Sequence, residues 1–440
     1  MEEKLTDKEY LGVTVPFMLS TMTQPLMGVV NTAVMGRMPD PKYIAAVALG
    51  AILFNNIYWF FGFLRVSTSG YAAQALGAGD RKASGMSFFR PLAIALVVSL
   101  CCILLQTPIV DLYLRWMAPE ADVAALCRVY YRILVWGAPL VLFNYVSLGW
   151  LMGQMRIRAS VFMQVSSNVL NMALSLWFVF GLGMAVEGVA WATLLSQIYG
   201  ALVGAWLMRI HADFDWRTFT LAEILEPRTL GKILTVNANL MIRTACLLTV
   251  NNIIAAVGTS FGTVVLAANA VLFQIKDIIS FLIDGMANGA AIFSGRALGK
   301  KSRKLLEETL GMTYRWLAVM VVLLAAGMVL GGDYLIRCLT DIRKVVAAAE
   351  DYTLYVVIYP FLAGMGLALY GLYTGTTFTA PVRNMMVMSL GVFWLAQELL
   401  VPRWGNDGLW VAFLLFYLSQ SVILFIYLGM LRKRFDRTPV

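Results

Sequence analysis

Long apolar stretches, separated by short polar or glycine- and proline-containing breaks, run through the whole chain. A stretch of about 18 or more apolar residues is long enough to cross the hydrocarbon core of a bilayer as a helix. Counted in this way, the pattern predicts twelve transmembrane helices. We place them near residues 11–36, 43–75, 87–110, 124–152, 158–181, 185–209, 231–257, 260–295, 313–331, 345–372, 384–402 and 406–430.

The composition agrees with this pattern. Of the 440 residues, 60% are hydrophobic and 13% are charged, and the mean hydropathy is +0.75. These values lie far from those of soluble globular domains. The first ten residues, MEEKLTDKEY, carry mixed charge, and no small-residue cleavage site follows them, so we expect no cleaved signal peptide. The expected fold class is therefore an all-α integral membrane protein.

The distribution of Lys and Arg predicts the orientation of the chain in the membrane. With loops assigned alternately to the two sides, most of these residues fall with the N-terminus, the loops near 76–90 and 209–232, and the C-terminal RKRFDR. The positive-inside rule then makes both termini cytoplasmic. The net charge of +9 follows from this topology, so no nucleic-acid partner is expected.

Cysteine and histidine offer little chemistry. The five cysteines are scattered without a CxxC pair, which predicts neither a disulfide framework nor a metal site. The single histidine, His211, falls in a predicted cytoplasmic loop, where a solvated residue is a better interpretation than a proton shuttle. We expect no metal and no cofactor.

The two halves of the chain match each other at one offset. Gly149 and Gly153 lie 222 positions before Gly371 and Gly375, and several other small-residue patches share this offset. A common offset across equivalent helix ends indicates a duplicated six-helix unit. Each GxxxG pair is also the spacing that lets two membrane helices approach closely, and helix packing is its favoured interpretation.

A duplication of six helices has consequences for the architecture. Because six is even, both copies cross the membrane in the same direction, and we expect a pseudo-two-fold axis along the membrane normal. Parallel repeats of this kind occur in transporters that work by alternating access. The expected lobes are residues 1–209 and 230–440, and the expected cytoplasmic linker loop is 210–229.

Charged residues inside the predicted helices are the first candidates for function. A charge at the bilayer centre costs at least about 2.5–3.5 kcal/mol on insertion scales and usually marks a site. We select Arg65, Arg243, Lys276, Asp277 and Asp284 as candidates for coupling or gating. Asp277 and Asp284 are two helical turns apart on nearly one face, whereas Lys276 points about 100° away and is not expected to share their partner.

The depths of these charges predict two ion pairs. Arg65 and Asp284 lie at similar depth in counterpart helices, and we hypothesise that they meet across a central cleft between the lobes. Arg243 and Asp277 lie near the midplane on adjacent antiparallel helices and are expected to pair there. The alternative for such a pair is a purely structural role in orienting helices.

A second group of polar residues is uncharged. Asn31 lies in the first predicted helix, and Asn168, Asn171 and Ser175 follow one face of the fifth at spacings of three and four. These residues are candidates for a substrate or cation cavity. Packing between helices explains them equally well.

Several stretches of the chain resemble the multidrug and toxic compound extrusion (MATE) family, in its DNA-damage-inducible F branch. The resemblance extends over essentially the whole chain. The matching stretches are MGVVNTAVMG (27–36), YIAAVALGA (43–51), FLRVSTSGYAAQALGAG (63–79), LGWLMGQMRIR (148–158), GMAVEGVAWATLLSQ (183–197), ANAVLFQ (268–274) and LIDGMANGAAIFSGRALG (282–299).

This resemblance implies secondary active efflux of amphipathic, often cationic compounds in exchange for protons or sodium ions. Arg65 and Asp284 stand where the branch usually has the same residues, whereas Asn31 and Ser175 stand where it usually has aspartates of a cation site. Asparagine and serine do not titrate in the usable range. Coupling is therefore expected to lie at Asp284 or Asp277, or to be weak.

The leading hypothesis is an efflux antiporter of a bacterial cytoplasmic membrane, acting as a single chain on an amphipathic small molecule. A lipid-linked precursor flippase of the same superfamily is the nearest alternative, but it would usually have more helices and a strongly cationic cavity. An integral membrane enzyme is disfavoured, because the predicted helices contain no histidine and no aspartate-rich metal motif.

Overall fold

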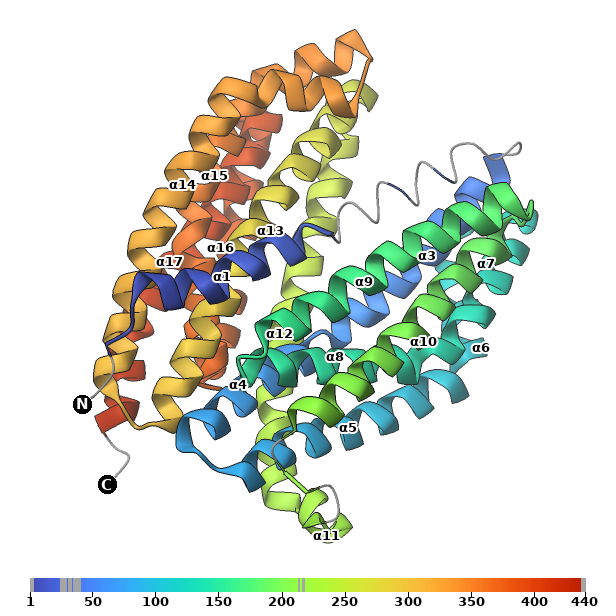
Figure 1. Cartoon of the computed structure of the whole chain (residues 1–440). Helices are drawn as coiled ribbons and strands as arrows, with labels where there is room; N and C mark the ends of the chain where they lie inside the picture. The colour runs from blue at the N-terminus through green and yellow to red at the C-terminus, as the bar shows by residue number, and fades with distance from the viewer. Residues whose placement is uncertain are drawn as a thin grey trace. The chain divides into compact units, whose positions relative to one another are not determined.

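A computed structural model describes residues 4–23, 30, 34, 41–212, 214–215 and 218–436 (Figure 1). Every regular element in these residues is helical. The α-helices are α1 (Asp7–Thr21), α3 (Pro41–Phe61), α4 (Phe63–Ala78), α5 (Arg81–Leu104), α6 (Gln106–Met117), α7 (Ala121–Leu134), α8 (Ala138–Gly153), α9 (Ile157–Leu176), α10 (Val186–His211), α11 (Leu221–Ile224), α12 (Pro227–Thr259), α13 (Thr263–Gly299), α14 (Arg303–Leu339), α15 (Arg343–Gly375), α16 (Ala380–Trp404) and α17 (Asn406–Asp436).

Ten helical segments of the described chain are long and apolar enough to cross a membrane. Ten of the twelve predicted helices correspond to them. The predicted helix 158–181 corresponds to α9, which is more polar than these ten segments. The predicted helix 11–36 is described mainly over α1. The predicted helix 43–75 is interrupted at Gly62, and 124–152 is interrupted by a 3-10 turn, Val135–Gly137.

The chain divides into two compact units. We call Met22–Leu234 the N-terminal unit, and Met1–Thr21 together with Thr235–Val440 the C-terminal unit. The predicted first lobe began at residue 1, whereas α1 belongs to the C-terminal unit in the structure. The reason is a close fit on α13, where a Cβ at Gly285 or Gly289 would collide with α1.

Polar contacts hold α1 in that position. The Tyr10 hydroxyl lies 2.9 Å from the Thr313 hydroxyl of α14, and the Tyr10 ring stacks on Phe293. The Thr21 hydroxyl donates to the Phe281 carbonyl at 2.9 Å. These contacts combine apolar burial with satisfied hydroxyl groups, so α1 is an integral part of the C-terminal unit.

The two units repeat the same helix contact at the predicted offset. In the N-terminal unit, Gly149 and Gly153 of α8 lie against the backbone of α4 at Arg65 and Ser69. In the C-terminal unit, their counterparts Gly371 and Gly375 of α15 lie against the backbone of α13 at Ala287 and Ala291, which are 222 positions beyond Arg65 and Ser69. The structure therefore supports the duplication, and the GxxxG pairs serve close packing.

The ends of the helices repeat as well. The Asp80 carboxylate accepts a hydrogen bond from the Ala83 amide at the start of α5, and the Ser302 hydroxyl accepts one from the Leu305 amide at the start of α14. Met155 and Thr377, which follow the two GxxxG helices, both have positive φ angles. Since Asp80 and Ser302, like Met155 and Thr377, are 222 positions apart, the turns were duplicated with the helices.

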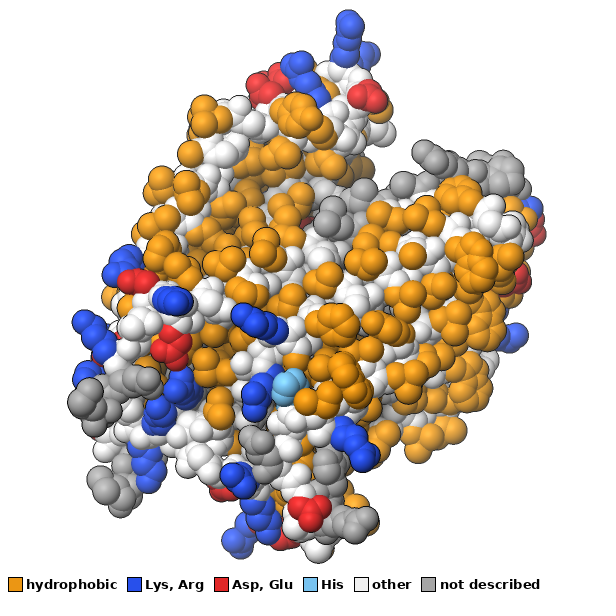
Figure 2. Space-filling model, viewed as in Figure 1, with side chains coloured by type: hydrophobic (Ala, Val, Ile, Leu, Met, Phe, Trp, Pro, Cys, Tyr) orange, Lys and Arg blue, Asp and Glu red, His pale blue; other side chains and the backbone are white. Residues whose placement is uncertain are grey.

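The surface agrees with insertion into a bilayer. On the face shown in Figure 2, apolar side chains cover the flanks of the helices, and most Lys and Arg side chains gather towards helix ends. Many large apolar residues are exposed, among them Leu330, Trp116 and Leu323. Exposed apolar area of this extent is unfavourable in water and is expected where lipid is the solvent.

Candidate functional site

The clearest ionic site in the described helices lies within α13. The Lys276 ammonium is 2.5 Å from the Asp277 carboxylate, and their side chains are 8% and 57% exposed. Lys276 follows the first residue of α13 by 13 positions, which puts it about 20 Å along the helix. The cation is therefore buried deep in a transmembrane helix, while its carboxylate partner lies at the surface of the unit.

Aromatic rings surround the buried cation. The Lys276 ammonium lies 5.7 Å from the ring centroids of Phe273 and Phe413. Both distances are within the range at which a ring face attracts a cation. Phe413, from α17, also packs on Tyr359 and Tyr417 with centroid distances of 5.9 and 5.0 Å. The rings supply part of the stabilisation that water would otherwise give the ammonium.

Two further polar groups border this cluster. The Ser280 hydroxyl lies 2.7 Å from the Tyr359 hydroxyl and also donates to the Lys276 carbonyl. Asp284, which is half-buried, lies close enough for its charge to act on both Lys276 and Tyr359. The site thus joins an ammonium, two carboxylates and a hydroxyl pair in one part of the C-terminal unit.

The partner of Asp277 differs from the predicted one. The sequence predicted an Arg243–Asp277 pair, but the guanidinium of Arg243 lies over the Tyr370 ring, 4.0 Å from its centroid, and its Nε has no hydrogen-bond partner. The contact between Lys276 and Asp277, whose positions are about 100° apart around the helix, was not predicted from the sequence. The lysine ammonium sits on a flexible four-carbon stem, which is long enough for it to reach the neighbouring carboxylate.

The predicted Arg65–Asp284 contact joins different units and stays a prediction. Arg65 lies in α4 of the N-terminal unit, half-buried, where its positive charge acts on Tyr145 of α8. Its carbonyl faces Gly149. The site that Arg65 occupies is therefore the close contact between α4 and α8.

The predicted polar face of α9 forms a second site, in the N-terminal unit. The Asn171 amide donates to the hydroxyls of Thr193 and Ser196 on α10, each at 3.2 Å. The Asn168 amide donates to the Thr23 hydroxyl at 2.7 Å. Asn31 lies outside the described residues. Asn171 therefore bridges α9 and α10, as the packing interpretation expects, and the role of these residues in a substrate or cation cavity stays a prediction.

Two oxygens of this second site are left unpaired. The Asn171 Oδ1 and the Ser175 Oγ are buried without a hydrogen-bond partner. A buried polar atom without a partner costs free energy, so such atoms commonly face a water or an ion. Neutral oxygens are suitable ligands for a sodium ion, and they cannot carry a proton at physiological pH.

Sequence reasoning did not find the aromatic cluster or the hydroxyls of α10. Thr193 and Ser196 are three residues apart in an apolar helix, so their spacing on one face was a usable signal. Phe413, Tyr359 and Tyr417 gave no such signal, because aromatic residues are common in membrane helices. Only folding brings α13, α15 and α17 together.

Ionic and polar groups buried inside the transmembrane helices of a multi-pass protein are typical of membrane transporters, where they border the paths of substrates and ions. Comparison with known proteins identifies the family. The MatE family model matches residues 16–177 and 240–396. The chain is 31% identical to DNA damage-inducible protein F of Escherichia coli (strain K12) over 422 residues, which is 95% of this chain and 91% of the relative.

Solved structures agree with the fold. An outward-facing structure of a multidrug resistance MATE family transporter superposes with a TM-score of 0.89 at 20% identity, over 99% of this chain and 98% of that one. A MOP superfamily transporter from Pyrococcus furiosus Vc1 superposes with a TM-score of 0.88 at 20% identity, over the same shares of the two chains. The chain belongs to the MatE family of transporters.

Proposed function

We propose that this protein exports amphipathic, cationic small molecules across a bacterial cytoplasmic membrane in exchange for protons or sodium ions. Its site would be exposed alternately to the two sides of the membrane, with both termini in the cytoplasm and one chain as the working unit. Two findings support this proposal: the chain belongs to the MatE family, and its fold is similar to that of a multidrug resistance MATE family transporter.

The single observation that carries the coupling part is the Lys276–Asp277 pair. Asp277 is 57% exposed although it lies deep within a transmembrane helix. A carboxylate in contact with lipid chains would be strongly unfavourable, so this face of α13 is expected to contact water. An exposed carboxylate that faces water can bind a proton or a cationic group. Either event would weaken its attraction for the neighbouring Lys276 ammonium.

The uncharged site of the N-terminal unit has a different part in the proposal. Asn171 and Ser175 offer neutral oxygens, so this site would bind sodium or substrate and would not carry protons. Protons would be carried by Asp277 or Asp284. The coupling ion therefore tells which unit holds the coupling site.

Asp284 is expected to take part in gradient-driven transport. In proteoliposomes with an imposed proton gradient or sodium gradient, the wild-type protein is expected to move a fluorescent organic cation against its own gradient. Asp284→Asn is expected to lower the gradient-driven rate about tenfold, which corresponds to about 1.4 kcal/mol. Asp333→Asn, in an exposed position near the end of α14, is the matched control and should keep the rate.

The outcomes separate the alternatives. Movement driven by the proton gradient alone supports coupling through Asp277 or Asp284, and movement driven by sodium alone supports the Asn171 and Ser175 site. If neither gradient moves the cation, the antiporter proposal fails. Gradient-independent movement of a labelled lipid-linked precursor would instead support the flippase alternative.

A further inference from the structure

Described residues of the connection between α10 and α12 are docked on the first half of α5. Phe214 and Phe219 pack against Phe89 of α5, with ring centroids 6.0 and 4.9 Å away. They also contact each other at 5.5 Å, and Phe214 lies edge-on to Trp150 of α8 at 5.9 Å. Four aromatic rings thus form one cluster at the end of the N-terminal unit.

One of these rings packs directly on a glycine of α5. A Cβ at Gly85 would collide with the Phe219 ring, and the three heavy atoms nearest to it all belong to that ring. Trp150 is fixed beneath the cluster, since its indole N–H donates to the Ser84 carbonyl at 3.0 Å. The surface of α5 is therefore shaped to hold Phe219.

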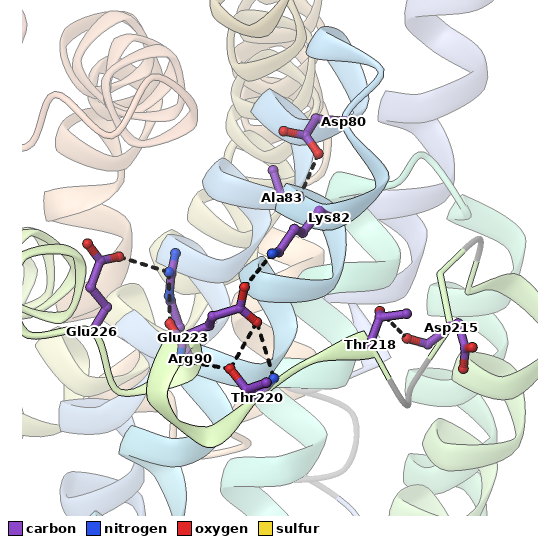
Figure 3. Close-up of polar contacts among 9 residues, drawn as sticks. All are labelled: Asp80, Lys82, Ala83, Arg90, Asp215, Thr218, Thr220, Glu223 and Glu226. Carbon is purple, nitrogen blue, oxygen red and sulfur yellow. Dashed lines mark hydrogen bonds and ion pairs between the residues drawn. The ribbon is translucent and has the colours of Figure 1, made fainter.

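Polar contacts fasten the same segment (Figure 3). Lys82 pairs with the Glu223 carboxylate. Arg90 donates to the Glu223 carbonyl at 3.0 Å and to the Glu226 carboxylate at 3.3 Å. Thr220 and Glu223 complete a capping box, which fixes the backbone at the start of α11. We call Phe214, Phe219, Thr220, Glu223 and Glu226 the linker clasp.

Glu226, the last residue of the linker clasp, directly precedes α12. The Glu226 carbonyl accepts the Leu230 amide, and its carboxylate accepts the Thr229 hydroxyl at 2.8 Å. Through Arg90, the first turn of α12 is thereby tied to α5. Further along, α12 passes from the N-terminal to the C-terminal unit between Leu234 and Thr235, without a break in the helix.

We propose that the linker clasp fixes the beginning of α12 to the N-terminal unit, so that movement between the units during transport bends α12 itself. The linker would then hold the first turn of α12 in place, and would not be a flexible connection between the two units. The bend falls near Gly231, where a Cβ would contact nothing within 4 Å and where a glycine weakens the helix interior.

Two insertions of the same flexible sequence, Gly-Ser-Gly-Ser, test this inference. An insertion after Ala212, ahead of the linker clasp, is expected to leave gradient-driven transport within about twofold of wild type, because lengthening a surface loop costs little. An insertion after Glu226 frees α12 from α5 and is expected to lower transport about tenfold, as hinge changes do. Binding of the fluorescent cation, measured by anisotropy, should be retained in both variants.

The two positions serve as controls for each other. Equal transport in the two insertion variants, whether both are active or both are impaired, would overturn the inference. The transport readout rests on the proposed function, but a second readout does not. In inside-out vesicles, trypsin cleavage after Arg217, which lies between Phe214 and Phe219 in the sequence, reports on whether these two residues are held against α5.

Gly85→Ala and Phe219→Ala are the variants for that second readout. Both abolish the contact between the Phe219 ring and Gly85, and both are expected to raise the cleavage rate about tenfold. Leu221→Ala is the matched control in the same segment, because Leu221 is 71% exposed, and it should leave the rate unchanged. Cleavage of the wild-type linker as fast as that of Gly85→Ala would show that the linker is not docked.

The charge of Glu223 in the linker clasp is predicted to be insensitive to cytoplasmic pH. The hydrogen bond from Lys82, followed by those from Thr220, lowers the pKa of Glu223 from 4.5 to about 2. A lowered pKa means that the contribution of this carboxylate is complete above about pH 4.5 and is lost as the pH falls through about 2. Hydrogen exchange of residues 218–226, corrected for intrinsic rates, should therefore show constant protection from pH 5.5 to 8.

Lys82→Met gives the comparison for this experiment. Because exposed ion pairs contribute little, the variant should lower protection only about twofold to fivefold. A clear loss of protection in the wild type between pH 8 and 5.5 would contradict the assignment of Glu223 to a persistent contact.

Discussion

Gly375→Ala is expected to destabilise the protein by about 3 kcal/mol or more, at or beyond the usual range for overpacking. A Cβ at this position collides with the Ala291 carbonyl and the Ser294 hydroxyl of α13. The carbonyl belongs to a helix backbone and cannot rotate away as a flexible side chain would. Thermal unfolding in detergent, followed by tryptophan fluorescence, measures the change.

The chain offers a matched control for this substitution. Gly391 lies in α16 and a Cβ there would contact nothing within 4 Å, so Gly391→Ala should be neutral or stabilising by up to about 1 kcal/mol. Gly153→Ala, at the counterpart position of the N-terminal unit, should destabilise as Gly375→Ala does. Similar unfolding midpoints for Gly375→Ala and Gly391→Ala would show that α13 and α15 are not packed backbone to backbone.

Asp277→Asn is expected to abolish most gradient-driven transport, and a double-mutant cycle with Lys276→Met separates coupling from packing. The single variant leaves a buried ammonium without its carboxylate, which is costly whatever the role of the pair. The double variant, Lys276→Met with Asp277→Asn, removes both charges. Its thermal stability should return to near the wild-type value, because an apolar side chain replaces the buried cation among Phe273 and Phe413.

Transport distinguishes the two roles of this pair. If Asp277 takes part in coupling, the double variant stays at least about tenfold slower than wild type, which corresponds to about 1.4 kcal/mol or more. Recovery of stability and of transport together would mean that the pair only orients α13. Stability is measured by thermal unfolding, and transport is measured in the same proteoliposome preparation.

The sequence predicted the fold class and the duplication because both depend on local or regularly spaced features. A membrane helix needs only a sufficient apolar length, and a close helix contact needs small residues at a fixed spacing. For this reason the offset that pairs Gly149 with Gly371 also pairs their contacts on α4 and α13. The helix α9 is less apolar than the ten other membrane helices because it carries polar residues, among them Asn171, which bonds to α10.

The partners of the charged residues could not be predicted in the same way. The sequence placed Arg243 and Asp277 at compatible depths, but depth along a helix does not tell which faces meet. The structure turns Arg243 towards Tyr370 and lets Lys276 reach its own neighbour Asp277. Side-chain length and the rotation of each helix decided these contacts, and neither is visible in a depth estimate.

By itself the sequence determined that this chain is a duplicated bundle of membrane helices with charges in α13, because apolar length and repeat spacing are properties of the chain alone. Only the tertiary structure decided that α1 belongs with α13, that aromatic rings enclose Lys276, and that the linker is held on α5. These arrangements join residues that are far apart in sequence. They depend on which surfaces are complementary in shape and charge once the helices are packed.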